Sequence, residues 1–490
     1  MPGRPARWAG PWAQPDEPRG CSRPRTPELP TMAATGQDRS RRSGRPPPDD
    51  GWKAVPRTMV RAMRSLVAST WAPWALLAVS LILHVVVTLL GSDAFNMVDL
   101  KVYYDGAGHL FDGTLYDFFS EPLHLPFTYP TFSALIFTPM VWIPWTVLRV
   151  LWQAASFGAI GLMAYSTLKL LGRAGPGAPH PVRHLRGIVV TVIALGLWLE
   201  PVRTTFNYGQ INLFLAALLL TGAAAAGPPA VPGDPMIDPK TTRRGDFWGG
   251  LSVGLAAGVK LTPALSGLYY LLQRRWWAVF WSVATFVATV AVGWIAAPSE
   301  TVRFFTSLMF DPARTGPIWS AINQSLRGAL SRVQGQDRVG VWLVCAALAF
   351  VLGLWCAWRS LRAGDRTAAF LAVQITALLI SPISWSHHWV WVLPLLLWCL
   401  FGPRQRSAAA RWLAIAWTVA TCSYVVSILI AQQYEDQPAS RPLWQSALGV
   451  VYPLLGLVTL AVLARLAGRP VTDGPVPIGR GQRAVDPGRG

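Results

Sequence analysis

Long apolar segments alternate with short polar connectors along most of this chain. Since about 20 apolar residues are needed to cross the roughly 30 Å of bilayer hydrocarbon, these segments predict an all-α, polytopic membrane protein. The predicted spans are 71–91, 146–171, 187–200, 210–226, 276–297, 339–360, 367–382, 388–402, 412–431 and 445–467. A further apolar stretch, 246–274, is too short for two full spans and predicts a re-entrant hairpin or a pair of short, tilted helices. Counting that pair as two gives about twelve crossings.

One apolar stretch, 131–144, is not counted as a crossing. Pro139 interrupts it, and counting it would place Arg173, Arg183 and Arg186 on the outer side. Cytoplasmic loops tend to retain the cations, so that placement is disfavoured. The stretch therefore predicts a short helix at the outer membrane surface.

The connectors between the spans divide into two sets by charge. With the basic N-terminal segment inside, the Arg-rich connectors all fall on the cytoplasmic side, and both ends of the chain are cytoplasmic. The outer set comprises the loops 92–128 and 298–337 and the segment 384–388. It holds most of the acidic, amide, imidazole and phenol side chains that chemistry could use. We therefore expect the active site to lie on the outer side of the membrane.

Composition supports a membrane protein and divides the chain into three parts. Hydrophobic residues make up 52% of the chain and charged residues only 14%, against about 25% charged in a typical soluble protein. The net charge of +19 follows from the connectors and tails, so topology explains it better than nucleic-acid binding. Residues 1–64 predict a disordered, basic cytoplasmic extension, 65–467 a transmembrane domain and 468–490 a disordered cytoplasmic tail.

Asp99 lies near the start of the first outer loop, close to the predicted end of span 71–91. A carboxylate there could act as a general base, taking a proton from an acceptor hydroxyl as the hydroxyl attacks. The alternative is that Asp99 is simply one of six solvated acids in this loop. Tyr103 and Tyr104 follow it and suit stacking on a sugar ring, although tyrosine is common at membrane interfaces anyway.

Lys260 lies at the turn of the apolar hairpin 246–274. An ionisable residue within membrane-embedded sequence is a functional hypothesis by default, and an ammonium group at the outer interface suits a lipid phosphate. The alternative is that Lys260 only reaches to the interface for solvation.

His387 and His388 follow Pro382 and two serines at the outer start of a span. Adjacent residues on a helix point in different directions, so a single metal ion rarely takes both. Donation to phosphate or sugar oxygens, helped by the helix N-terminus, fits better. For at least one of the two, an interfacial histidine satisfied by the backbone is the alternative.

Polar residues also gather in two outer motifs. They are Asn207, Gln210 and Asn212 before and at the start of span 210–226, and Asn323, Gln324 and Arg327 in loop 298–337. Amides can bind hydroxyl groups and arginine can bind phosphate. However, amides also join helices within membranes, and the asparagine sequon at 323 is a weak glycosylation signal.

Six motifs occur in an order that resembles a known enzyme family. They are Asp99-Leu100-Lys101-Val102-Tyr103, Leu115-Tyr116, Phe127-Thr128-Tyr129-Pro130, Asn207-Tyr208-Gly209-Gln210-Ile211-Asn212, Gly258-Val259-Lys260-Leu261-Thr262-Pro263 and Asn323-Gln324-Ser325. Over roughly residues 70–465 they resemble the actinobacterial polyprenyl-phosphate-mannose-dependent α-1,2-mannosyltransferases. That family belongs to the membrane-embedded GT-C glycosyltransferases and includes the phosphatidylinositol mannoside mannosyltransferase. Thr131 is a small departure, since relatives often carry a second proline there.

The resemblance implies an inverting transfer of mannose from polyprenyl-phosphate-mannose, forming an α-1,2 linkage on the outer face of the plasma membrane. It implies a GT-C-type bundle with outer-face loops and short interfacial helices. It assigns the catalytic base to Asp99 and the family's outer-face histidine to His387 or His388. Tyr129 joins the other tyrosines and the amides as an expected sugar or acceptor contact.

The expected partners are a lipid-linked donor, a glycolipid acceptor and membrane lipid, with no nucleic acid. Lys260 with Arg203 or Arg327 could neutralise the donor phosphate, so we predict no metal and no cofactor. The acceptor stays open between a phosphatidylinositol mannoside and a larger mannan, and the sugar could differ from mannose. The alternative function is a transporter or flippase of a lipid-linked sugar. It is weaker because the polar residues collect on one side of the bilayer, whereas transport needs access from both.

Overall fold

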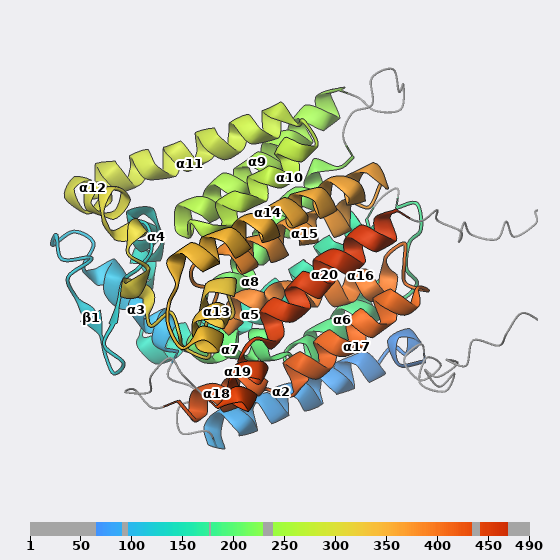
Figure 1. Ribbon diagram of the computed structural model, residues 1–490, viewed down its shortest axis with the longest axis horizontal. Coiled ribbons are helices and arrows are strands. Elements are labelled where there is room, and N and C mark those ends of the chain that lie inside the picture. The colour runs from blue at the N-terminus through green and yellow to red at the C-terminus, as the bar shows by residue number, and fades with distance from the viewer. Residues whose placement is uncertain (1–64, 91–96, 176–177, 229–238, 434–441, 469–490) are drawn as a thin grey trace, which may run out of the picture. The chain divides into compact units, whose positions relative to one another are not determined.

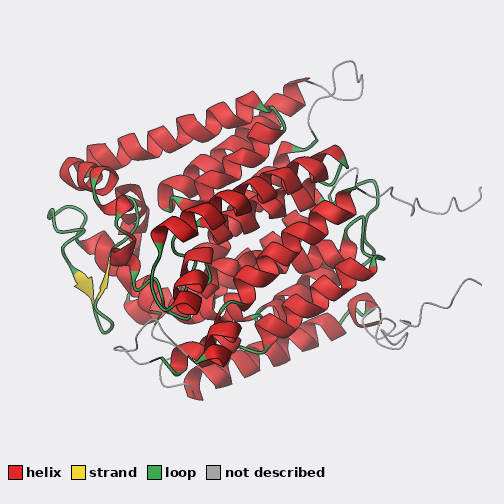
Figure 2. Cartoon of the chain, in the orientation of Figure 1, coloured by secondary structure: helices red, strands yellow, loops and turns green. Residues whose placement is uncertain are grey.

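The computed structural model describes residues 65–90, 97–175, 178–228, 239–433 and 442–468. The predicted extension 1–64 and nearly all of the predicted tail 468–490 lie outside the described residues. Within the described residues the chain is almost entirely helical, with one two-stranded hairpin formed by β1 (Phe119–Ser120) and β2 (Leu125–Pro126) (Figure 2). The predicted all-α class is therefore confirmed.

Five helices in the described residues are long and apolar enough to cross a membrane. They are α2 (Ala72–Leu90), α5 (Trp145–Leu170), α11 (Trp276–Ala296), α14 (Val339–Arg362) and the stretch made by α17 (Ala408–Cys422) with α18 (Val425–Ala431). Two bent pairs raise the number to seven: α6 (Leu185–Gly196) with α7 (Glu200–Tyr208), and α19 (Leu443–Gly449) with α20 (Val451–Ala467). The predicted count of twelve is not confirmed.

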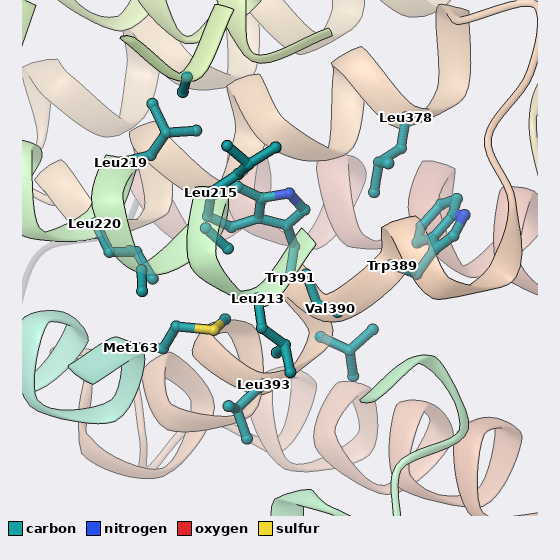
Figure 3. Packing of buried hydrophobic residues seen from close by; sticks show 14 of the residues in the cluster. Met163, Leu213, Leu215, Leu219, Leu220, Leu378, Trp389, Val390, Trp391 and Leu393 are labelled. Atoms are coloured by element: carbon teal, nitrogen blue, oxygen red, sulfur yellow. The ribbon is translucent and has the colours of Figure 1, made fainter. Parts of the chain in front are cut away.

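Several predicted spans form helices that are shorter than a bilayer crossing and lie inside the protein. They are α8 (Asn212–Ala226), α15 (Arg366–Ile380), and η5 (Ser386–Trp391) with α16 (Val392–Phe401). Most side chains of α8 and α15 are buried, and they meet α5 and η5 in the core drawn in Figure 3. By contrast, α2, α11 and α14 each expose a row of large apolar side chains. Figure 1 places α11 and α2 on opposite edges of this helical unit, so the peripheral helices carry the surface suited to lipid.

Helix α9 (Pro239–Val259) differs from the short, equal legs predicted for 246–274. It is a full helix of 21 residues, and only η2 (Thr262–Ser266) and α10 (Gly267–Leu272) return from it. The prediction relied on hydropathy and stopped at the basic connector, but lysine and arginine are good helix formers and the helix continues through them. At the far end Arg275 donates to Asp246 at 2.5 Å and to the carbonyl of Ala226 at 2.6 Å, which ties α9 and α10 to α8.

Glycines allow α9 to pack closely against α11. Gly250, Gly254 and Gly258 recur every fourth residue and face α11, so they lie on one side of the helix. A Cβ atom at Gly254 would lie 2.5 Å from the Cβ atom of Thr285. Small residues at such interfaces let helix backbones approach closely. The contact fixes the end of α9, where Lys260 follows.

Short elements gather at one end of the helices, at the left of Figure 1. They are α3 (Val98–Gly108), α4 (Thr131–Phe137), η1 (Thr138–Trp142), α12 (Pro298–Thr306), η3 (Leu308–Phe310), η4 (Pro312–Thr315) and α13 (Leu326–Gln334). The short helix predicted over 131–144 is confirmed, because α4 and η1 together end at Trp142. The segments that carry the candidate site residues all reach this end.

Substituting Gly254 with alanine tests the packing of α9 on α11. The added methyl group would overlap Thr285 and lie 2.7 Å from the carbonyl oxygen of Ser282, so we expect a loss of about 1–3 kcal/mol in stability. The melting temperature of the detergent-solubilised protein measures it. Gly158→Ala is the matched control, because no atom lies within 4 Å of its added Cβ. Equal melting temperatures for the two variants would contradict the packing argument.

Candidate functional site

Four segments meet at the end of the bundle and form what we call the polar cluster. They are the start of α3, which carries Asp99, the turn from α7 into α8, which carries Gln210 and Asn212, the residue after α9, Lys260, and η5, which carries His387 and His388. Two contacts dock α3 on α7: the amide of Met97 donates to the carbonyl of Asn207 at 3.2 Å, and Gly209 lies against Leu100. This docking places Asp99 beside the turn.

Asp99 has an environment that suits a general base. Burial raises the pKa of Asp99 to about 6, while a hydrogen bond from the Gln210 amide and the positive charge of Lys260 partly oppose that shift. Residue 99 nevertheless keeps accessible surface. A carboxylate with a pKa near the working pH is ionised yet basic enough to accept a proton.

Two buried tyrosines form a hydrogen-bonded network behind Asp99. The hydroxyl of Tyr103 lies 3.0 Å from the Tyr129 hydroxyl and donates to Gln210 Oε1 at 3.0 Å. Its ring stacks on Phe137, with ring centres 4.7 Å apart. Tyr104 points elsewhere, with its hydroxyl 3.4 Å from the Val141 carbonyl. The structure therefore brings Tyr103 and Tyr129 to the polar cluster but not Tyr104.

Lys260 supplies the positive charge of the cluster. Its ammonium donates to Asn212 Oδ1 and to His388 Nε2, both at 3.0 Å, and lies 5.3 Å from the centre of the Tyr129 ring. Its charge also acts on Asp99. An ammonium group held by neutral partners keeps its full positive charge available to an anionic ligand.

The two histidines differ in their surroundings. His387 is 3% exposed, both of its ring nitrogens lack a hydrogen-bond partner among the described residues, and its ring packs edge-on against Tyr208. His388 is partly exposed and contacts Lys260. The structure therefore distinguishes the two histidines, which the sequence alone could not do: His388 faces the accessible part of the cluster.

The two arginines expected at the donor phosphate have other partners. Arg203 is 3% exposed and bonds to His84 and to Thr88, the latter at 3.2 Å. Arg327 forms a two-point ion pair with Asp337, at 3.1 and 2.7 Å. The structure does not bring either guanidinium to the polar cluster. Their partners come from distant helices or a later loop, which local sequence does not reveal.

Asn323 and Gln324 are fully buried and support the segment before the histidines. Asn323 accepts hydrogen bonds from the amides of Ser384 and Ser325, and its backbone pairs with Trp385 in an antiparallel bridge. The Gln324 side chain donates to the Gly449 carbonyl at 3.0 Å. Both amides therefore join chain segments in this structure, the alternative left open by the sequence.

Asn207 lies at the edge of the cluster, and its side-chain oxygen has no partner among the described residues. Tyr208 and Thr205 are two residues that the sequence did not single out. Tyr208 packs on His387 and acts electrostatically on Asp99, and Thr205 donates to the His387 carbonyl at 3.3 Å. Tyr208 belongs to the same polar motif as Asn207, which was the available signal, whereas Thr205 precedes that motif.

Comparison with known proteins identifies the family. The model of glycosyltransferase family 87 matches residues 127–382, which include Lys260 and His388 but begin after Asp99. A protein of Mycolicibacterium smegmatis, a polyprenol-phosphate-mannose-dependent alpha-(1-2)-phosphatidylinositol pentamannoside mannosyltransferase, is 38% identical over 79% of this chain and 90% of its own. A Mycobacterium tuberculosis protein, the corresponding phosphatidylinositol mannoside mannosyltransferase, is 31% identical over 74% of this chain and 84% of its own.

Among solved structures, ArnT from Cupriavidus metallidurans in the apo state aligns with a TM-score of 0.34 and 15% identity, covering 79% of this chain and 77% of that one. The curated relatives are all transferases, so the transporter alternative finds no support. The family match extends over half of the sequence, and its relatives align along nearly their whole length. The chain therefore belongs to glycosyltransferase family 87.

Proposed function

We propose that this glycosyltransferase moves mannose from polyprenyl-phosphate-mannose to a phosphatidylinositol mannoside and forms an α-1,2 linkage. One observation carries the proposal: an accessible carboxylate, Asp99, lies within electrostatic reach of an accessible cation, Lys260. Glycosyl transfer from a phosphate donor needs a base for the attacking hydroxyl and positive charge at the leaving phosphate. The names of the relatives support the donor, the acceptor and the linkage.

In the proposed reaction, Asp99 accepts the proton of the acceptor hydroxyl as its oxygen attacks the anomeric carbon of the donor sugar. The bond from that carbon to the phosphate oxygen breaks, and the electron pair leaves with the polyprenyl phosphate. Attack on the side opposite the leaving group inverts the anomeric centre. Tyr208 is partly exposed and interacts electrostatically with Asp99, so we assign it a contact with the sugar.

The leaving phosphate gains negative charge as the bond breaks. Lys260 and His388 are held together at 3.0 Å on the accessible side of the cluster, where they can donate to the phosphate oxygens. Fixed donors aimed at developing charge are among the strongest contributions to catalysis. We therefore assign donor phosphate binding to Lys260 and His388, and leave Arg203 and Arg327 out.

We also propose that the cluster faces the outside of the plasma membrane and that both chain ends are cytoplasmic. Cationic connectors lie at the opposite ends of elements that carry the cluster: Arg275 bonds to the carbonyl of Ala226 at the end of α8, and Arg173 bonds to that of Phe401 at the end of α16. Cytoplasmic loops retain such cations. A lipid-linked donor and a glycolipid acceptor would then both reach the site from the outer leaflet.

Replacing Asp99 with asparagine keeps the shape of the side chain but removes the base. We expect at least about a 100-fold loss in the rate of transfer of radiolabelled mannose from polyprenyl-phosphate-mannose to a phosphatidylinositol mannoside, because general-base catalysis contributes about 10²–10⁴-fold. Asp112→Asn is the control, since that acid is exposed in the same loop. Near-normal turnover by Asp99→Asn would remove Asp99 from the mechanism.

The pH dependence of transfer tests the ionisation state of Asp99. The base is active when deprotonated, and the pKa of Asp99 lies at about 6. We therefore expect the rate to fall as the pH is lowered through about 6, with the slope of a single proton. A rate that stays constant from pH 7 to pH 5 would exclude a group with this pKa as the base.

Lys260→Gln tests the assignment of the donor phosphate. Loss of the ammonium should raise the KM for polyprenyl-phosphate-mannose at least about tenfold, since a charged hydrogen bond contributes about 1.5–3 kcal/mol. The KM for the acceptor should change little. Arg303→Gln is the control, because that surface cation pairs with Asp117 outside the cluster. If both variants raise the donor KM equally, general charge attraction explains the effect and Lys260 has no specific role.

A further inference from the structure

The turn between α7 and α8 contacts each of the groups to which we assign chemistry. The Gln210 side chain is close enough to Asp99 to lower its pKa, Asn212 accepts from Lys260, and Asn212 also donates to the carbonyl of His387, next to His388. These two amides are separated by one residue in the sequence. A short turn thus lies at the junction of the base, the cation and the histidine segment.

The two amides are buried, whereas the groups they hold are accessible. Gln210 is 2% exposed and Asn212 is 8% exposed, but Asp99, Lys260 and His388 keep accessible surface. A sugar that enters the site would reach the accessible groups first. This difference argues against direct sugar contact, the role that sequence suggested for both amides.

The hydrogen bonds of Gln210 fix which way its amide points. Its oxygen accepts from the Tyr103 hydroxyl at 3.0 Å, and its nitrogen lies 3.4 Å from the Tyr129 hydroxyl. With its oxygen occupied by Tyr103, the NH₂ group is the part left to donate to the Asp99 carboxylate. Gln210 thereby favours the ionised form of Asp99.

Asn212 uses both ends of its side chain in the same way. Its oxygen accepts from the Lys260 ammonium at 3.0 Å, and its nitrogen donates to the His387 carbonyl at 3.0 Å. The ammonium is therefore aimed by a neutral acceptor that leaves its charge uncompensated. The same side chain also locates the backbone that carries His388.

The backbone of the turn explains how both amides come so close to α3. Gly209 has a φ of 68° and ends α7, and a Cβ atom there would lie 2.5 Å from the Cβ atom of Leu100. Only glycine combines this conformation with such a close approach at low cost. The turn therefore packs directly on the residue that follows Asp99.

We infer that Gln210 and Asn212 are positioning residues: Gln210 orients the base Asp99, and Asn212 orients the phosphate-binding Lys260. This inference rests on the proposed function and deepens it. Because the two amides hold different groups, their loss should affect different kinetic quantities. A purely structural role would instead affect both quantities together.

Gln210→Leu removes the donor to Asp99 at nearly constant volume. The pKa of Asp99 should rise, so the acidic limb of the pH profile of kcat/KM should move to higher pH by about one unit, as expected for a lost hydrogen bond to a charged group. The other titratable groups that act on Asp99 stay in place: Lys260 after α9, Tyr103 on α3, Tyr129 before α4 and Tyr208 on α7. The KM for polyprenyl-phosphate-mannose should stay within about twofold.

Asn212→Leu should mainly change the donor KM, whereas Gln210→Leu should mainly change the acidic limb of the pH profile. The KM for polyprenyl-phosphate-mannose should rise about tenfold because Lys260 loses its acceptor, while the acidic limb should move less than in Gln210→Leu because Lys260 keeps its charge. Gln374→Leu is the matched control for both variants. Gln374 is a buried glutamine that bonds to Ser266 on η2, and its loss should move neither quantity.

Second variants keep the inference testable if a leucine variant does not fold. Tyr103→Phe retains the ring stack but frees the Gln210 oxygen, and it should shift the acidic limb in the same direction by a smaller amount. Asn212→Asp keeps the side-chain size but pairs the ammonium with a carboxylate, and it should raise the donor KM.

Two results would overturn the inference. One is an increase in acceptor KM in both variants without a change in the acidic limb or the donor KM, which would make the amides acceptor contacts. The other is the same change in Gln374→Leu as in the test variants, which would make them structural only. The proposed function fails separately, if the wild-type protein transfers no mannose from this donor.

Discussion

The structure at the end of the bundle depends on how the ammonium group of Lys260 is held within an otherwise apolar protein. Burying a charge there costs free energy unless polar groups bind it or its function requires it to stay unpaired. The protein provides neutral partners, Asn212 and His388, together with the face of the Tyr129 ring. The charge of Lys260 acts on Asp99, but among the described residues no salt bridge joins the two, so neither group is neutralised directly by the other.

Helix packing far from the cluster determines where that ammonium group lies. The glycine row brings α9 against α11, and Arg275 ties the other end of α9 to α8. Lys260, directly after α9, also donates to Asn212, the first residue of α8, so α8 and α9 are joined at both ends. The position of Lys260 therefore depends on the close packing of the bundle beneath it.

Much of this arrangement could be predicted from sequence, because hydrophobic length and charge asymmetry are local signals. They located most of the apolar helices, the short helix over 131–144, and the segments that carry Asp99 and Lys260. They failed where partners are distant or where polar sequence continues a helix. Arg203 bonds to a histidine on the first helix, and α9 runs through a basic connector. Choosing between His387 and His388 required knowing how deeply each side chain is buried, and the sequence of two adjacent histidines does not give that information.

The shortness of α8 has a consequence for where the chemistry takes place. Its 15 residues rise about 22 Å, whereas the hydrocarbon layer is about 30 Å thick. Under the proposed topology, a helix that ends at the inner boundary would begin several ångströms below the outer one. The catalytic groups would then occupy a recess within the leaflet, and a mannose carried on a long isoprenoid could reach them by sliding laterally, without being pulled up into water.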